Sequence, residues 1–181
     1  MILVTGGARS GKSAFTEKMA AVQCQQVLYI ATSVIMDSEM AQRVARHQAD
    51  RPSHWRTWEG YLNLGEVIRQ QGKIDEGVML ECITTMIAHL LFDASHGEPP
   101  ETLDFAPLET FVEQQITDVI DACQQSESPV YLVTNELGMG IVPENRLSRH
   151  FVDIAGRANQ RLAAAADEVW MVVSGIGVKL K

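Results

Sequence analysis

The chain begins with Met1-Ile-Leu-Val-Thr5 and continues directly into Gly6-Gly-Ala-Arg-Ser-Gly-Lys-Ser13. The first segment is apolar and partly β-branched, which predicts a buried strand. The second segment matches G-x4-G-K-S/T, a glycine-rich loop whose backbone N–H groups converge on phosphate oxygens. Residues 14–22 contain no Gly or Pro, and they predict a helix whose positive N-terminus faces the phosphates. Strand, loop and helix together predict a nucleotide-binding site.

Individual residues of this loop have separate chemical tasks. Gly6, Gly7 and Gly11 are expected to permit positive φ values and close backbone approach to the phosphates. We expect Lys12 to reach the β- and γ-phosphates and the Ser13 hydroxyl to ligate Mg²⁺. A glycine-rich turn can match the pattern by chance, but the flanking strand and helix and the complete lysine–serine pair argue against that alternative.

The composition narrows the class of protein. With 181 residues, 46% hydrophobic and 21% charged, the chain is ordinary for one globular domain. A net charge of −8 disfavours a nucleic-acid partner, because binding a phosphate backbone needs a basic face. Cys24, Cys82 and Cys123 show no metal-ligand spacing, which is typical of reduced thiols in a cytosolic protein. No signal peptide and no apolar run of membrane-spanning length is visible, so we expect a cytoplasmic enzyme with a single domain, residues 1–181.

Segments typical of strands and of helices alternate along the rest of the chain. Strands are expected at residues 26–32, 55–59, 77–82, 130–134 and 167–173, with a short edge strand at 178–181. Helices are expected from 37 or 38 to about 50, and at 61–71, 84–92, 105–125 and 144–166. This alternation predicts an α/β fold with a mostly parallel, doubly wound sheet.

Several polar residues stand where predicted strands end. Ligands of an open parallel sheet lie beyond the carboxyl ends of its strands, so Thr32 and Ser33 are expected near the nucleotide, with capping or turn formation as an equal alternative. Glu81 ends a short apolar strand, where a carboxylate holds Mg²⁺ directly or through water. Glu59 fits either a solvated strand end or a contact to base or ribose, and the residues alone favour the first.

His47 is the residue with the most divergent interpretations. At 3.6 residues per turn, Met40, Val44 and His47 share one helix face, and a lone histidine on such a face is usually a core residue. However, Arg46 and Arg51 are close in sequence, as expected around a polyphosphate. No second histidine or carboxylate stands at metal-ligand spacing, which weakens a metal site.

Longer motifs extend beyond the phosphate loop and follow one another in the order and spacing of a known enzyme family. They lie at residues 6–13, 29–33, 43–47, 51–59, 81–84, 134–143, 153–156 and 159–160, so they cover essentially the full length. On these motifs the chain resembles the bifunctional adenosylcobinamide kinase / adenosylcobinamide-phosphate guanylyltransferases of cobalamin biosynthesis, closest to the enterobacterial form. The loop alone would indicate a superfamily, whereas the N-E-x-G-x-G-I-V-P run and the helix histidine make the match specific.

The resemblance implies two reactions, both requiring Mg²⁺. ATP or GTP phosphorylates the aminopropanol hydroxyl of adenosylcobinamide. GTP then guanylylates a histidine, and GMP passes to adenosylcobinamide phosphate, giving adenosyl-GDP-cobinamide and pyrophosphate. The resemblance also implies a P-loop NTPase domain of RecA-like α/β fold, assembled as a homotrimer.

Site residues follow from the resemblance by position. The guanylylated residue is His47, and Lys12 is the second catalytic residue. Metal ligands are Ser13 and Glu81. The nucleotide contacts are Gly6, Gly7, Ala8, Arg9, Ser10, Gly11, Lys12, Ser13, Ala31, Thr32, Ser33, Gln48, Ala49, Asp50, Arg51, Glu59 and Glu81. Many relatives have aspartate where Glu81 stands, and the added methylene leaves direct ligation, outer-sphere contact and ribose contact open.

Three other classes of protein share part of this pattern. A monofunctional small-molecule kinase uses the same loop and sheet. A GTP-hydrolysing switch protein needs N-K-x-D, but Asn135 is followed by Glu-Leu-Gly, and the D-x-x-G match at residues 153–156 comes too late in the chain. A nucleotide-binding module without turnover would have no use for His47.

Overall fold

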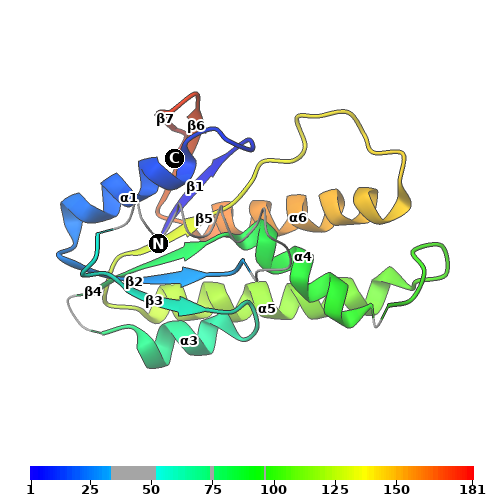
Figure 1. Ribbon diagram of the computed structural model, residues 1–181, viewed down its shortest axis with the longest axis horizontal. Helices are drawn as coiled ribbons and strands as arrows, with labels where there is room; N and C mark the ends of the chain where they lie inside the picture. The colour runs from blue at the N-terminus through cyan, green and yellow to red at the C-terminus, as the bar shows by residue number, and fades with distance from the viewer. Residues whose placement is uncertain (34–51, 74–75, 96) are drawn as a thin grey trace.

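The computed structural model describes residues 1–33, 52–73, 76–95 and 97–181 (Figure 1). The strands are β1 (Ile2–Gly6), β2 (Gln26–Ala31), β3 (Arg56–Glu59), β4 (Glu76–Glu81), β5 (Val130–Val133), β6 (Glu168–Val173) and β7 (Ile176–Lys179). The helices are α1 (Lys12–Gln23), α3 (Leu64–Gln71), α4 (Ile83–Ala94), α5 (Phe105–Gln125) and α6 (Arg146–Ala165). The helix expected from residue 37 or 38 to about 50 lies outside the described residues.

The strands form one seven-stranded sheet in the order β3-β2-β4-β5-β1-β6-β7. All pairings are parallel except that of β6 with β7, so the predicted mostly parallel sheet is confirmed. The short, half-exposed β3 and β7 stand at the two edges, whereas the strands between them are rich in buried apolar residues. Because β1, β2, β4 and β5 run in the same direction, their carboxyl ends meet at one edge, where a ligand site is expected.

Helices cover both faces of the sheet, and Figure 1 shows α1 on the opposite side from α3 and α5. On the α1 face a smaller core contains Ala20, Val27, Tyr29, Met79 and Tyr131. On the other face α3, α4, α5 and α6 pack over a larger core. The apolar stripe of α5 is buried there at Leu108, Val112, Ile116 and Val119, as the helical period predicts.

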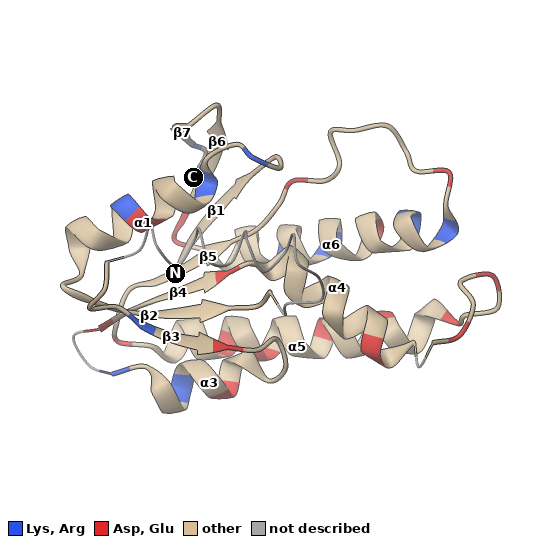
Figure 2. Ribbon diagram, viewed as in Figure 1, with Lys and Arg blue, Asp and Glu red and all other residues tan. Residues whose placement is uncertain are grey.

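Ion pairs join α5 to α3 and to α6. Arg69 on α3 pairs with Asp118 on α5 at 2.7 Å, and Arg157 on α6 pairs with Glu109 on α5. Figure 2 shows acidic and basic residues interspersed over these helices. Ion pairs as exposed as these contribute at most about 1 kcal/mol each to the stability of the fold. The buried apolar stripe therefore holds α5 in place more strongly than the ion pairs do.

Three of the element boundaries that differ from the sequence predictions lie next to residues with positive φ. α3 begins at Leu64 rather than 61, because Asn63 before it is in the left-handed region with φ 54°. α1 begins at Lys12 rather than 14, directly after Gly11 with φ 89°. β7 begins two residues earlier than expected, since Ser174 and Gly175, with φ values of 51° and 82°, form a tight turn that suits a hairpin.

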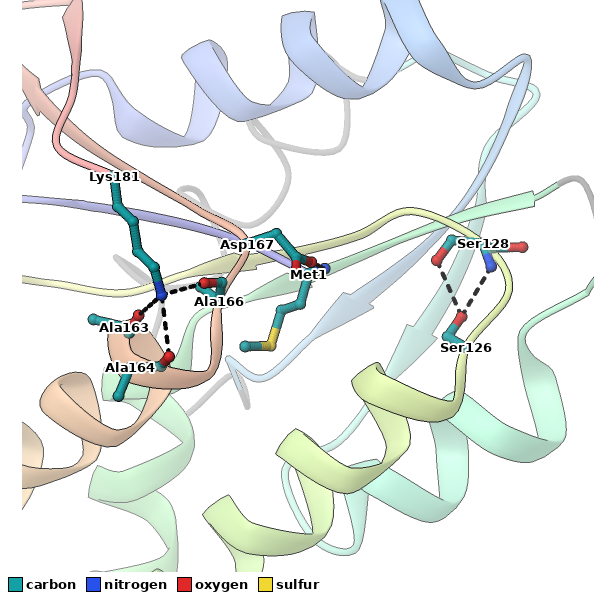
Figure 3. Close-up of polar contacts among 8 residues, drawn as sticks. All are labelled: Met1, Ser126, Ser128, Ala163, Ala164, Ala166, Asp167 and Lys181. Carbon is teal, nitrogen blue, oxygen red and sulfur yellow. Dashed lines mark hydrogen bonds and ion pairs between the residues drawn. The ribbon is translucent and has the colours of Figure 1, made fainter.

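Both ends of the chain are tied to the junction between α6 and β6 (Figure 3). The amino group of Met1 pairs with the Asp167 carboxylate at 2.5 Å. The Lys181 ammonium donates to the carbonyl oxygens of Ala163, Ala164 and Ala166, at 3.2, 3.1 and 2.6 Å. These carbonyls end α6, where a positive charge complements the helix dipole.

The Arg56–Glu76 pair should make the stability of the fold pH-dependent. Arg56 Nε donates to Glu76 Oε1 at 2.9 Å, and this hydrogen bond lowers the pKa of the buried Glu76 carboxyl below its ordinary value of 4.5. A depressed carboxyl pKa stabilises the folded state above about pH 4.5, and this contribution is lost as the pH falls through the folded-state pKa. Glu76→Gln is therefore expected to lower the free energy of unfolding by about 1–3 kcal/mol near neutral pH.

Urea denaturation of the parent and the Glu76→Gln variant at about pH 7 and about pH 3 measures this effect, and the difference should shrink at the lower pH. Glu98→Gln, at an exposed carboxylate, serves as the control. An equal loss at both pH values would contradict the role given to the charge of Glu76.

Candidate nucleotide-binding site

The glycine-rich loop connects β1 to α1 at the carboxyl edge of the sheet. Gly11 takes φ 89°, a left-handed conformation that favours glycine. Gly6 is buried against β6, and a Cβ at this position would lie 2.5 Å from the Val172 carbonyl oxygen. Gly6 and Gly7 have no positive φ, so that part of the prediction is wrong for both, and an added Cβ at Gly7 would have no protein neighbour within 4 Å. Close approach of the Gly7 backbone to a phosphate stays a prediction. Two glycines therefore shape this loop.

Two neighbouring segments hold the loop in place. The Glu136 N–H, just past β5, donates to the Gly6 carbonyl at 3.0 Å. The Gly175 N–H, in the turn between β6 and β7, donates to the Ser10 carbonyl at 2.7 Å. Ala8 and Arg9, between these anchors, are exposed. The loop thus presents its tip to solvent while both its ends are fixed to the sheet.

Lys12 is the first residue of α1, and its side chain folds back over the loop. The residue is only 8% exposed, and its Nζ donates to the Gly7 carbonyl at 3.2 Å. The first turn of α1 contains no acidic residue and no side-chain cap on its N–H groups. A buried ammonium beside open helix N–H groups is an arrangement that binds phosphate.

Glu81, at the end of β4, lies beside Ser13 as the sequence predicts for a metal-binding pair. The Ser13 hydroxyl donates to Glu81 Oε1, and the Tyr29 hydroxyl donates to Glu81 Oε2 at 2.7 Å. Hydroxyl and carboxylate oxygens are the hard ligands that Mg²⁺ prefers. Within the described residues no group of three His, Cys, Asp or Glu residues could hold a metal. The donor set therefore fits a Mg²⁺ ion that takes its remaining ligands from nucleotide phosphates and water.

The register of the strands places three predicted site residues in one row. Ala31 at the end of β2 is the register partner of Glu59 on one side and of Glu81 on the other. Side chains in one register row project to the same face of a sheet, here the face that α1 covers. Glu59 is exposed and Glu81 is half-buried. The predicted strand-end contacts thus share one edge with the loop.

Thr32 has a structural role within this edge. It is fully buried, and its hydroxyl both accepts from the Cys82 N–H and donates to the Cys82 carbonyl, each at 2.8 Å. With both contacts made inside the protein, the hydroxyl ties β2 to the junction of β4 and α4. The Thr32 side chain therefore makes a tie between distant segments, neither a local turn nor a helix cap. Ser33, the next residue along the edge, is half-buried.

A polar network lies where β4 and its neighbour β5 end, and the sequence analysis does not predict it. The Thr84 hydroxyl lies 3.1 Å from that of Thr134 and accepts from the Asn135 N–H at 2.8 Å. Asn159 on α6 accepts from the Thr134 hydroxyl at 2.7 Å and donates to the Asn135 carbonyl at 2.9 Å. This network joins α4, the end of β5 and α6 through Asn135, the residue that precedes Glu136. Its sequence signal was the polar run after the 130–134 strand.

The remaining predicted residues, His47, Gln48, Ala49, Asp50 and Arg51, lie outside the described residues. The site assembled from the described chain is thus a phosphate-binding loop, a helix N-terminus, a buried lysine and a serine–carboxylate pair at one sheet edge.

Comparison with known proteins identifies the family of this chain. The sequence model of the family described as cobinamide kinase / cobinamide phosphate guanyltransferase matches residues 2–180. The chain belongs to this family. It is 58% identical over 181 residues to the bifunctional adenosylcobalamin biosynthesis protein CobU of Salmonella typhimurium and 56% identical to that of Escherichia coli K12. Each alignment covers 100% of this chain and 99% of the relative.

Among solved structures, the chain is similar to a prototypical ATPase from the type III secretion system of pathogenic bacteria, with a TM-score of 0.57 and 13% identity. The alignment covers 98% of this chain and 56% of the ATPase chain. At this identity the likeness shows the fold alone, and it confirms the predicted RecA-like α/β class.

Membership of the family confirms the predicted activity and decides between the rival classes. The protein is a bifunctional cobinamide kinase and cobinamide-phosphate guanylyltransferase of adenosylcobalamin biosynthesis. The switch protein, the monofunctional kinase and the module without turnover are thereby excluded. Among the described residues, no helix combines the length and hydropathy that crossing a bilayer requires.

Proposed function

We propose that a single nucleotide site, built on the loop at residues 6–13 within one domain spanning 1–181, serves both reactions. The observation that carries this proposal is the contact of the Ser13 hydroxyl with the Glu81 carboxylate, beside the buried Lys12. Both reactions use a nucleoside triphosphate, and the closeness of Lys12, Ser13 and Glu81 supports one phosphate site for both.

In the kinase reaction the residues of the loop bind and orient ATP or GTP. The α1 N–H groups and the Lys12 ammonium face the β- and γ-phosphates, where negative charge grows as the γ-phosphoryl group moves to the corrinoid hydroxyl. Mg²⁺, held by Ser13 and Glu81 together with phosphate oxygens, would add charge neutralisation at the same place. Phosphoryl transfer depends mainly on such positioning and charge stabilisation, which this site offers.

In the guanylyltransferase reaction we propose that His47 is the nucleophile. A neutral imidazole nitrogen attacks the α-phosphorus of GTP, the bond to the β-phosphate oxygen breaks, and pyrophosphate leaves. A phosphate oxygen of adenosylcobinamide phosphate then attacks the same phosphorus, and the imidazole leaves as the phosphoramidate bond breaks. The choice of residue is supported by the family position of His47 and of the neighbouring contacts at residues 48–51.

Nucleotide binding tests the single site. Titration of the purified protein with non-hydrolysable GTP and ATP analogues is expected to give one bound nucleotide per chain. The two analogues should compete, because both occupy the loop. Independent binding of both analogues to the same chain would contradict a shared site.

Glu81→Gln is expected to weaken Mg²⁺-dependent turnover more than folding. The change removes the carboxylate charge with little change in volume, and the amide oxygen of the introduced side chain can still accept a hydrogen bond from Ser13 or Tyr29. We expect a rate loss of about tenfold to a hundredfold at limiting Mg²⁺. Activity over a range of Mg²⁺ concentrations measures the effect, with Glu113→Gln on exposed α5 surface as the control. An unchanged rate and Mg²⁺ dependence would exclude the metal role.

We also propose that the protein acts in the cytoplasm, where its nucleotide substrates are made, and that it forms a homotrimer. Four apolar side chains at the β6–β7 edge are 51–69% exposed: Val173, Ile176, Val178 and Leu180. Such an exposed apolar patch supports association between chains. Light scattering after gel filtration should give three times the chain mass of 20.0 kDa. A mass of one chain would contradict the trimer.

A further inference from the structure

We propose that Tyr29 is a positioning residue that holds the Glu81 carboxylate against Ser13. This inference rests on the proposed metal role of Glu81 and adds to it the residue that orients the carboxylate. Tyr29 lies within β2, is 2% exposed, and belongs to the core beneath α1. Its hydroxyl donates to Glu81 Oε2 at 2.7 Å.

Strand register explains how the two residues meet. Ala31 is the register partner of Glu81, and Tyr29 precedes Ala31 by two positions on the same face of the sheet. The long tyrosine side chain spans this diagonal, which is within reach for an aromatic residue. The Tyr29 ring is therefore buried in the core while its hydroxyl reaches the edge where the loop lies.

The two oxygens of the carboxylate are held from different elements. Ser13, on α1, donates to Oε1, and Tyr29, on the sheet, donates to Oε2. With its proton directed at Glu81, the Ser13 hydroxyl keeps its lone pairs for a cation. Glutamate has one more rotatable bond than aspartate, so a second anchor on the carboxylate limits the additional freedom. Tyr29 supplies that anchor.

Tyr131 provides a matched control. It lies on β5, and Met79 of β4 is the register partner of both tyrosines, so they stand in one row on one face. Tyr131 is 0% exposed, and its hydroxyl donates to Gln23 Oε1 at 2.5 Å, at the far end of α1 from the loop. Tyr131→Phe thus removes an equally buried hydroxyl without touching Glu81.

The experiment measures the binding of a fluorescent GDP analogue as a function of Mg²⁺ concentration, which requires no turnover. Tyr29→Phe is expected to raise the Mg²⁺ concentration that gives half of the maximal effect on analogue binding. The increase should be about threefold to tenfold, because a hydrogen bond to a charged group is lost. Tyr131→Phe should leave this Mg²⁺ concentration unchanged, although it should shift the thermal midpoint of unfolding about as much as Tyr29→Phe does. In a Glu81→Gln background, adding Tyr29→Phe should have no further effect on the Mg²⁺ dependence.

The outcomes separate this inference from the proposal on which it rests. If Glu81→Gln shifts the Mg²⁺ dependence and Tyr29→Phe does not, the positioning role is overturned while the metal role of Glu81 stands. If neither variant shifts it, both are overturned. Equal shifts for Tyr29→Phe and Tyr131→Phe would show a general packing effect and would also overturn the positioning role.

Discussion

Lys12→Ala is expected to abolish both the phosphorylation of adenosylcobinamide and the transfer of GMP. Lys12 is 8% exposed at the N-terminus of α1, where its charge faces the phosphate loop. Removing a charge that stabilises a phosphate transition state costs about 3 kcal/mol or more, which corresponds to a rate loss of at least about a hundredfold. Because one loop is proposed to serve both reactions, the two rates should fall together.

The fold of this variant should remain intact. The hydrogen bond that Lys12 gives at 3.2 Å goes to Gly7, within the loop itself, so its loss breaks no contact between strands. Circular dichroism and the thermal midpoint establish folding, and separate assays follow the two products. Lys18→Ala, at an exposed lysine of the same helix, is the control. A folded Lys12→Ala variant with normal kinase turnover would contradict the shared loop.

The parts of the structure that sequence analysis predicted depend on local patterns. β1 and the loop follow from an apolar run joined to G-x4-G-K-S, and α5 matches its predicted bounds because its apolar stripe keeps the helical period over the whole helix. Glu81 was predicted to lie near Ser13 because it ends a strand, and the carboxyl ends of parallel strands share one edge. The structure has the two side chains in contact.

The parts that were missed depend on register between segments far apart in the chain. Tyr29 looks like an ordinary core residue of a strand, and its contact with Glu81 exists because β2 and β4 pair with Ala31 opposite Glu81. The contacts of Thr84 with Thr134 likewise need α4 and β5 in place. No local pattern encodes such pairings, because the same residues in another register would face other neighbours. Gly7 shows the opposite case, a motif glycine for which the structure shows neither a positive φ nor a close protein neighbour.

The second large effect concerns His47, for which the residues alone allow two interpretations. If the imidazole only fills space in a core, His47→Ala leaves a cavity. The free energy of unfolding then falls by about 2–4 kcal/mol, and both activities fall together. If His47 carries GMP, His47→Asn should abolish GMP transfer, a loss of at least about a thousandfold, while much of the kinase rate remains. The kinase reaction needs no covalent intermediate, so a split between the two activities identifies the nucleophile.

Labelled GTP tests this role of His47 directly. Incubation with GTP labelled at the α-phosphate should leave label on the denatured parent protein, whereas GTP labelled at the γ-phosphate should leave none, because pyrophosphate departs with the β- and γ-phosphates. The bond should be labile in acid and stable in alkali, as expected for a phosphoramidate. His54, which is exposed just before β3, is the matched histidine, and His54→Asn should retain the label. Label retained on His47→Asn and lost from His54→Asn would transfer the nucleophilic role to His54.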